Sequence, residues 1–238
     1  MGNKQHKLFR RLRTPLWIML YAIYLYLSGL SLRQVERTLK TAGIDRSREA
    51  VRKWIHRFGS LSLKLLTPKA SRRIAVVDET CIRLGRQKAW LWIAVDPYNR
   101  AFLAFQITPV RNVWTAYSFL RRLRRRHGVR IVVTDGATWY PSAACWARLR
   151  HVVLSGGMRS YAERLIECLK DRMKGFDVCF PRLSLKRFTS AISWIGAWLA
   201  FYNYVRTHLS LGFPPLGLKP LDEFARLCWL VCEVMHIA

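Results

Sequence analysis

Acidic side chains are scarce in this chain. Only 14 of its 238 residues are Asp or Glu, against 41 Lys or Arg, which gives a formal net charge of +27 and a pI near 10.9. Such an excess goes beyond what solubility requires and indicates a polyanionic partner, either nucleic acid or an anionic membrane surface. Because acids are so few, a carboxylate at a structurally defined position needs a specific reason to be there.

A complete set of zinc-ligand cysteines is absent. The six cysteines include no Cys-x-x-Cys pair, and Cys228 and Cys232, four residues apart, have no second Cys pair nearby to complete a tetrahedral site. Buried, reduced thiols are the simpler interpretation. They suit a cytosolic protein rather than a secreted one.

A hydrophobic run of membrane-spanning length is also lacking. The nearly uncharged stretch from Leu16 to Leu32 follows a basic segment, a combination typical of a signal peptide or membrane anchor. Ser28 and Gly29 interrupt the run after about 13 residues, short of the ~20 that a spanning helix needs. We therefore expect no membrane partner. At 51% hydrophobic residues, the chain can bury the core of one to two domains.

The amino-terminal region, residues 1–60, has the pattern of a helix-turn-helix DNA-binding domain. We expect three helices between residues 15 and 59, the second starting at the capping box Ser31-Leu-Arg-Gln34 and the third running from Ser47 to Gly59. The outer face of the third helix is then basic and becomes the candidate DNA-binding surface. Its residues are Arg48, Arg52, His56 and Arg57. The alternative is a small helical bundle with a solvated basic face. Residues 61–72 are expected to form a linker.

From Arg73 onward the periodicity is that of strands alternating with helices. Short apolar strands are expected at 74–78, 89–95, 101–107, 130–134 and 151–154, with helices at 112–126, 138–150 and 160–174. This order predicts an α/β domain with a mixed five-stranded sheet and helices on both faces. Ligand sites of such sheets lie beyond the carboxyl ends of the strands, and Asp78 and Asp135 follow two of them.

These two aspartates and Glu163, on the last of these helices, form a candidate metal site. Carboxylate oxygens are the ligands that Mg²⁺ and Mn²⁺ prefer, and two such ions about 3.5–4 Å apart can promote phosphoryl transfer. In that arrangement Asp78 binds both ions, Asp135 one and Glu163 the other. Glu79 points to the opposite side of its strand, and Asp96 belongs to a turn. Glu167, one helical turn after Glu163, is a rival for the third position.

Several motifs taken in order resemble the DDE transposases of insertion sequences. They are Val77-Asp-Glu-Thr80, Val133-Thr-Asp-Gly-Ala-Thr-Trp-Tyr-Pro141, Ala162-Glu-Arg164 with Leu169-Lys-Asp-Arg172, and Phe201-Tyr-Asn-Tyr204 with the later His208-Leu-Ser-Leu-Gly212. The nearest likeness is to the compact archaeal branch of insertion-sequence family six. The resemblance covers about residues 28–220.

The resemblance implies a ribonuclease H-like catalytic core at residues 73–180 with Asp78, Asp135 and Glu163 as its metal-binding triad. It also implies Lys170 and Arg172 as DNA contacts, since a basic residue two helical turns after the glutamate belongs to the family motif. The implied activity is metal-dependent cleavage and strand transfer of double-stranded DNA by a homodimer or larger oligomer. Residues 181–238 are expected to complete the core or contact a second copy. A DNA-binding regulator with an inert α/β domain, or a nuclease that cuts without joining, are the alternatives.

Overall fold

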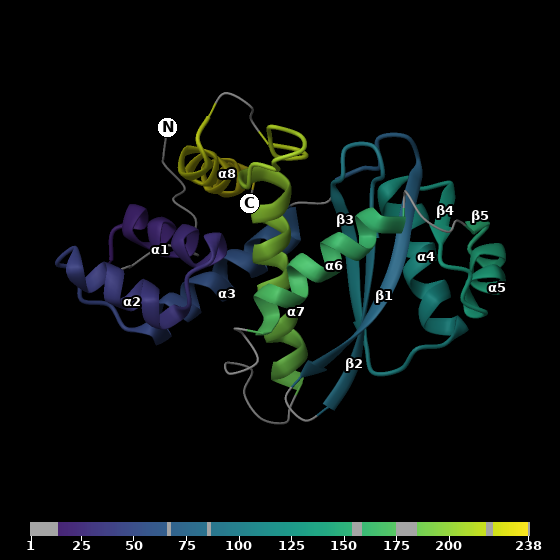
Figure 1. The fold of residues 1–238 in the computed structure, drawn as a ribbon, viewed down its shortest axis with the longest axis horizontal. Helices are drawn as coiled ribbons and strands as arrows, with labels where there is room; N and C mark the ends of the chain where they lie inside the picture. Colours follow the sequence, from purple (N-terminus) through teal and green to yellow (C-terminus); the bar gives the residue numbers. More distant parts are fainter. Residues whose placement is uncertain are drawn as a thin grey trace. The chain divides into compact units, whose positions relative to one another are not determined.

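The computed structural model describes residues 14–65, 68–84, 87–153, 159–174, 185–217 and 221–237. The chain divides into two compact units (Figure 1). One combines residues 1–66 with 192–238, and the other comprises residues 67–191. The carboxyl-terminal region therefore does not complete the α/β unit as expected, because from Ile192 onward it belongs with the amino-terminal helices.

The first unit is all helical. Its amino-terminal part contains α1 (Leu16–Ser28), α2 (Leu32–Thr41) and α3 (Arg48–Leu65), and its carboxyl-terminal part contains the second half of α7 (Leu185–Ala200), a π-helical turn η1 (Phe201–Val205) and α8 (Glu223–Ile237). The predicted capping box is present: Gln34 N–H donates to Ser31 Oγ at 3.2 Å, and Ser31 N–H donates to Gln34 Oε1 at 2.8 Å. No helix within the described ranges is both long and apolar enough to cross a membrane.

The predicted end of the third helix at Gly59 is wrong, because α3 continues to Leu65. A Cβ atom at Gly59 would lie 1.6 Å from the Ser193 carbonyl oxygen, and one at Gly196 would lie 2.8 Å from the Gly59 carbonyl oxygen. The two glycines thus allow the backbones of α3 and α7 to touch. Gly59 serves this close packing rather than helix termination, and residues 61–65 are helical instead of forming a linker.

The second unit is built on one five-stranded sheet. The strands are β1 (Ile74–Leu84), β2 (Gln87–Val95), β3 (Phe102–Thr108), β4 (Ile131–Thr134) and β5 (Arg150–Val153), in the order β3-β2-β1-β4-β5. The first three are antiparallel, and β1, β4 and β5 are parallel. The predicted mixed α/β sheet is confirmed.

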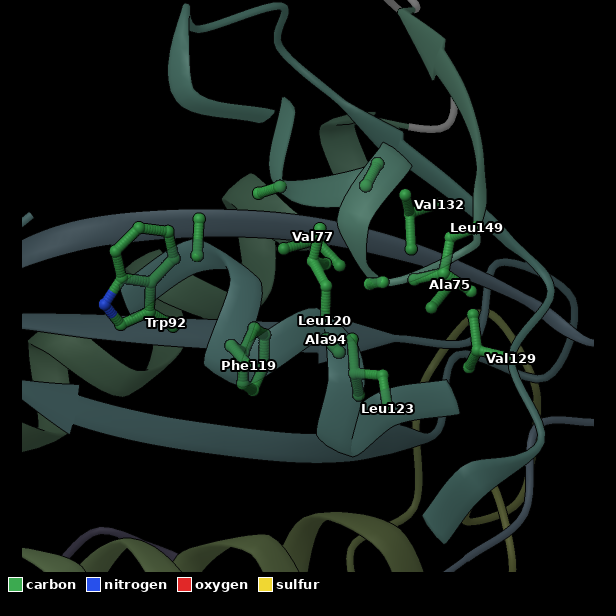
Figure 2. Close-up of a cluster of buried hydrophobic side chains, with 14 of the residues drawn as sticks. Ala75, Val77, Trp92, Ala94, Phe119, Leu120, Leu123, Val129, Val132 and Leu149 are labelled. Atoms are coloured by element: carbon green, nitrogen blue, oxygen red, sulfur yellow. The ribbon is translucent and has the colours of Figure 1, made fainter. Parts of the chain in front are cut away.

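Helices cover both faces of this sheet (Figure 1). On one face, α4 (Val113–His127) and α5 (Trp139–Trp146) enclose a core to which β1 contributes Ala75 and Val77. Figure 2 draws these side chains in one cluster with Trp92 of β2 and Phe119 of α4. On the other face, α6 (Arg159–Lys174) packs on β1 and β2. Alternation along β1 therefore directs odd-numbered residues 75–79 toward α4 and α5, and Asp78 toward the α6 face.

Candidate functional site

Strand register brings Asp78 and Asp135 side by side. In the parallel pairing of β1 with β4, Ile74 lies opposite Ile131 and Val76 opposite Val133. Continuing this register by two residues places position 78 of β1 opposite position 135, directly after the end of β4. The two aspartates, 57 residues apart in sequence, therefore reach the same edge of the sheet because both follow a buried apolar run that pairs in register.

Asp78 does not end its strand, which corrects the sequence-based boundary. β1 continues to Leu84 because its second half pairs residue by residue with β2, as far as Leu84 opposite Gln87. What ends near Asp78 is the pairing with β4. The side chain is half-buried, and its Oδ1 accepts a hydrogen bond from the Glu79 N–H at 2.8 Å. Asp78 thus lies where β1 is paired with β2, just beyond its last pair with β4.

Asp135 directly follows β4, as predicted, and is exposed. Its Oδ1 accepts a hydrogen bond from the Ala137 N–H at 3.1 Å, which forms a tight turn at Gly136. Gly136 has φ +82°, and a Cβ atom there would lie 2.9 Å from Val153 Cγ1. The turn therefore needs glycine for both its backbone angle and its packing against β5. It fixes the Asp135 carboxylate at the sheet edge.

Glu163 lies on α6, which buries Ala162, Leu165, Ile166 and Leu169. Glu163, Glu167 and Lys170 are exposed on the same helix. The helix contacts β1 and β2 on the face to which Asp78 points. The choice between Glu163 and Glu167 is left open by this arrangement, and the Arg172 side chain lies outside the described residues. No three His, Cys, Asp or Glu side chains among the described residues are grouped closely enough to hold a metal ion.

Glu79 faces away from Asp78, as predicted from strand alternation, but it is not an isolated residue. Its side chain is 3% exposed; it accepts a hydrogen bond from the Tyr140 hydroxyl, and Arg111 lies 3.5 Å away. The pKa of Glu79 is raised to about 6, chiefly by burial; the Tyr140 hydrogen bond opposes the rise, and the negative charges of Asp135 and Asp78 contribute to it. Sequence alternation predicted the direction of this side chain but not these partners.

The Glu79 cluster consists of Glu79, Tyr140, Arg111 and Trp139. The Arg111 guanidinium lies 3.9 Å from the Trp90 ring centroid and 4.5 Å from that of Trp139. Trp139 is half-buried and packs against the core under α5. Burial and the neighbouring Glu79 raise the pKa of the Tyr140 hydroxyl well above its usual value. The hydroxyl therefore remains a hydrogen-bond donor at neutral pH. The adjacent acids Asp78 and Glu79 thus serve different faces of the sheet.

The four predicted DNA contacts on α3 lie in different environments. Arg48 is exposed, Arg57 is half-buried, and Arg52 is paired with Glu49 at 2.7 Å. The outward position expected for His56 is wrong: it is half-buried, and its Nδ1 lies 2.7 Å from Ser193 Oγ on α7. Lys53, which the helical pattern did not single out, is exposed instead.

Comparison with known proteins identifies the family. The sequence model of the DDE domain DDE_Tnp_IS240 matches residues 73–167, a range that contains Asp78, Asp135 and Glu163. The "Uncharacterized protein MJ0017" of the archaeon Methanocaldococcus jannaschii is 31% identical over 206 residues, 85% of this chain and 93% of the relative. The chain belongs to the DDE transposases of insertion sequences.

Solved structures with a related chain path come from retroviruses. The catalytic core of the HTLV-2 integrase in complex with magnesium is 16% identical, with a TM-score of 0.45 over 63% of this chain and 95% of that one. A chain of the simian T-cell lymphotropic virus intasome is 15% identical, with a TM-score of 0.46 over 68% of this chain. This chain spans about half of that intasome chain, 55%.

The acids of the DDE domain are of the chemical type that a divalent cation requires. Asp78 and Asp135 carry carboxylate oxygens beyond the last β1–β4 pair, and Glu163 and Glu167 carry others on the helix that packs on β1 and β2. Hard oxygen donors of this kind suit Mg²⁺ and Mn²⁺ and do not suit softer metals that prefer nitrogen or sulfur. The residues present therefore fit the metal that the family implies.

Proposed function

We propose that this DDE transposase binds the ends of an insertion sequence, cuts the DNA there and joins the freed 3′-hydroxyl to target DNA. The observation that carries the proposal is the β1–β4 register, by which Asp78 and Asp135 occupy adjacent positions at one sheet edge. The formal charge of +27 supports a partner with a phosphate backbone.

Each acid has a distinct role in the proposed mechanism. Asp78 is the central ligand, because it lies on β1, the strand between β2 and β4. Asp135 is the second ligand, oriented by its hydrogen bond with the Ala137 N–H. Glu163 closes the site from α6. Divalent ions held there would stabilise the attacking and leaving oxygens of an in-line phosphoryl transfer. Both cutting and joining are transfers of this type.

Positively charged side chains hold the DNA in this proposal. Lys170 is exposed two helical turns after Glu163, so it can contact a phosphate next to the bond that is cut. Arg172, whose side chain lies outside the described residues, is proposed as a further DNA contact. Arg48, Arg52, Arg57 and the exposed Lys53 on α3 are proposed to bind the element end, through a helix-turn-helix formed by residues 1–60. A homodimer or larger oligomer would hold two ends together.

A joining assay tests this function. Purified full-length chain is incubated with labelled element-end DNA, a supercoiled target plasmid and Mg²⁺ or Mn²⁺, and the products are separated on a denaturing gel. The proposal expects end-cleaved DNA and plasmid-joined DNA. Cleavage without joining would indicate a nuclease, and binding without either product would indicate a regulator.

A comparison of two variants assigns the third acid. Glu163→Gln should abolish both products, whereas Glu167→Gln, a matched change one helical turn away on the same exposed surface of α6, should retain them. The reverse result would transfer the role to Glu167.

A further inference from the structure

A basic pocket lies between α4 and the carboxyl-terminal end of α5. Its volume is about 540 Å³, in the range of small-molecule sites. Arginines and aromatic residues make up nearly all of its lining: Tyr117, Arg121, Arg124, Arg125, Trp146 and Arg148. Tyr140 of the Glu79 cluster and Trp146 are six residues apart on α5, a rise of about 9 Å, so the pocket lies at the other end of this helix from the acids.

The four arginines concentrate positive charge at one place on the surface of α4 and α5. None of them forms an ion pair with an acid in the part of the chain that the structure describes. Arg124 donates a hydrogen bond to the Ala147 carbonyl at 3.1 Å, which anchors its guanidinium at the pocket wall. Such a group of unneutralised guanidinium ions in a concave site favours a multiply charged anion, for which phosphate has the matching geometry.

Arg148 occupies a position where a glycine is usual. It follows α5 with φ +53°, in the left-handed region, and Leu149 N–H donates to the Ala144 carbonyl at 2.9 Å to close the helix end. Glycine is the residue that ordinarily fills this site because a Cβ atom makes the conformation costly. The chain therefore keeps an arginine here at the expense of backbone strain, and that arginine lines the pocket.

Two tryptophans provide an exposed aromatic surface beside these charges. The rings of Trp114 and Trp146 lie 5.0 Å apart at an interplanar angle of 32°, and Tyr117 meets Trp146 edge-on at 6.2 Å. Trp114 is 65% exposed and Trp146 47% exposed, which is unusual for the largest apolar side chain. An exposed indole pair next to arginines matches the two requirements of single-strand recognition, a stacking surface for a base and cations for the backbone.

We propose that this pocket binds an unpaired nucleotide of single-stranded DNA, with the base stacked on the Trp114–Trp146 pair and the phosphates held by Arg121, Arg124, Arg125 and Arg148. The proposal rests on the proposed function only in taking DNA as the partner. It adds a contact for an unpaired segment of the strand, separate from the acidic site.

Fluorescence anisotropy tests this proposal in the full-length chain. The probes are a fluorescein-labelled oligothymidylate of about ten nucleotides and a duplex of equal length, in EDTA so that no cleavage occurs. Trp114→Ala/Trp146→Ala should weaken oligothymidylate binding at least about fivefold, the effect of losing one stacked base, and change duplex binding less than about twofold. Trp146→Phe, which keeps an aromatic face, should lose less oligothymidylate affinity than the double alanine variant.

Arg148→Gly tests the charge while relieving backbone strain, so misfolding does not explain a loss of binding. It should weaken oligothymidylate binding several-fold and reduce the slope of log affinity against log salt by about 0.7. Arg73→Gly is the matched control, because Arg73 is also exposed with a left-handed backbone (φ 59°) but lies outside the pocket. It should leave binding nearly unchanged.

Three results would overturn the proposal. The first is an equal effect of Arg148→Gly and Arg73→Gly on oligothymidylate binding. The second is an unchanged oligothymidylate affinity of the double tryptophan variant. The third is a change in the oligomeric state of the double tryptophan variant, measured by sedimentation velocity. The last result would mean that the tryptophans form a contact between copies. Because the assay contains no metal and measures no chemistry, its failure is distinguishable from failure of strand joining.

Discussion

Protonation of His56 should destabilise the helical unit, and replacing this residue should remove that pH dependence. His56 on α3 is half-buried against α7, and its Nδ1 lies 2.7 Å from Ser193 Oγ. Burial, and next the positive charge of Arg52, lower the pKa of the imidazole, Glu49 opposes the shift, and the result is a pKa of about 4. The folded protein therefore favours the neutral ring.

The sign and size of the effect follow from this lowered pKa. An unfolded histidine has a pKa of about 6.5, so the unfolded chain takes up a proton at higher pH than the folded chain. The stabilisation is fully present above pH 6.5 and is lost as the pH falls toward 4. For a pKa of about 4, the loss between pH 7.5 and pH 5 is about 2 kcal/mol, and its limit at lower pH is about 3 kcal/mol.

Denaturant unfolding at pH 7.5 and pH 5 measures this loss in the wild type and in His56→Asn. Asparagine can place a polar atom near the position of Nδ1 but does not titrate. The difference between the two proteins should therefore shrink by about 2 kcal/mol at the lower pH, while the contributions of the carboxylates cancel. Ser193→Ala is the control that removes the hydrogen-bond partner and retains the titrating ring. If wild type and His56→Asn lose equal stability, the account of a buried neutral imidazole is wrong.

Three further predictions concern packing, metal and DNA. Gly59→Ala should lower the free energy of unfolding, measured by denaturant titration, by more than about 3 kcal/mol, because the added Cβ atom would overlap the α7 backbone. Gly43→Ala is the control: Gly43 has φ +75° and open space around it, and the change should cost about 1 kcal/mol. Similar losses in the two variants would refute the close packing of α3 and α7. Mg²⁺ at ten times its Kd should raise the free energy of unfolding of the wild type, followed by thermal unfolding, by about 1.4 kcal/mol. An equal rise in Asp78→Asn would mean that the ion binds at another site. Arg48→Ala and Lys53→Ala should each lower the salt slope of duplex binding by about 0.9, the value for one neutralised phosphate, and unchanged slopes would exclude α3 as the DNA surface.

Local sequence patterns were sufficient to predict most of the α/β unit. The apolar runs before Asp78 and Asp135 identify β1 and β4 because a buried parallel strand needs such a run. The apolar run before Asp78 did not reveal that β1 continues to Leu84. The second half of β1 is stabilised by pairing with β2 rather than by its own hydrophobicity.

Contacts between segments far apart in the sequence could not be predicted in this way. The structural role of Gly59 depends on Ser193, and the burial of His56 depends on the same residue, 137 positions later. The pocket of α4 and α5 combines an arginine-rich helix face with Arg148, whose left-handed backbone angle has no signature in the sequence. Each of these features arises from packing between elements and not from local propensity.

The most direct test of the acidic site is strand joining by Asp78→Asn. This change keeps the size of the side chain and removes the charge that the proposed ions require. Asp171→Asn, an exposed acid of α6 outside the proposed triad, is the matched control. With labelled end DNA and Mg²⁺, the control should join DNA like the wild type, and Asp78→Asn should lose joining by at least about a thousandfold. Joining by Asp78→Asn at the wild-type level would contradict the account.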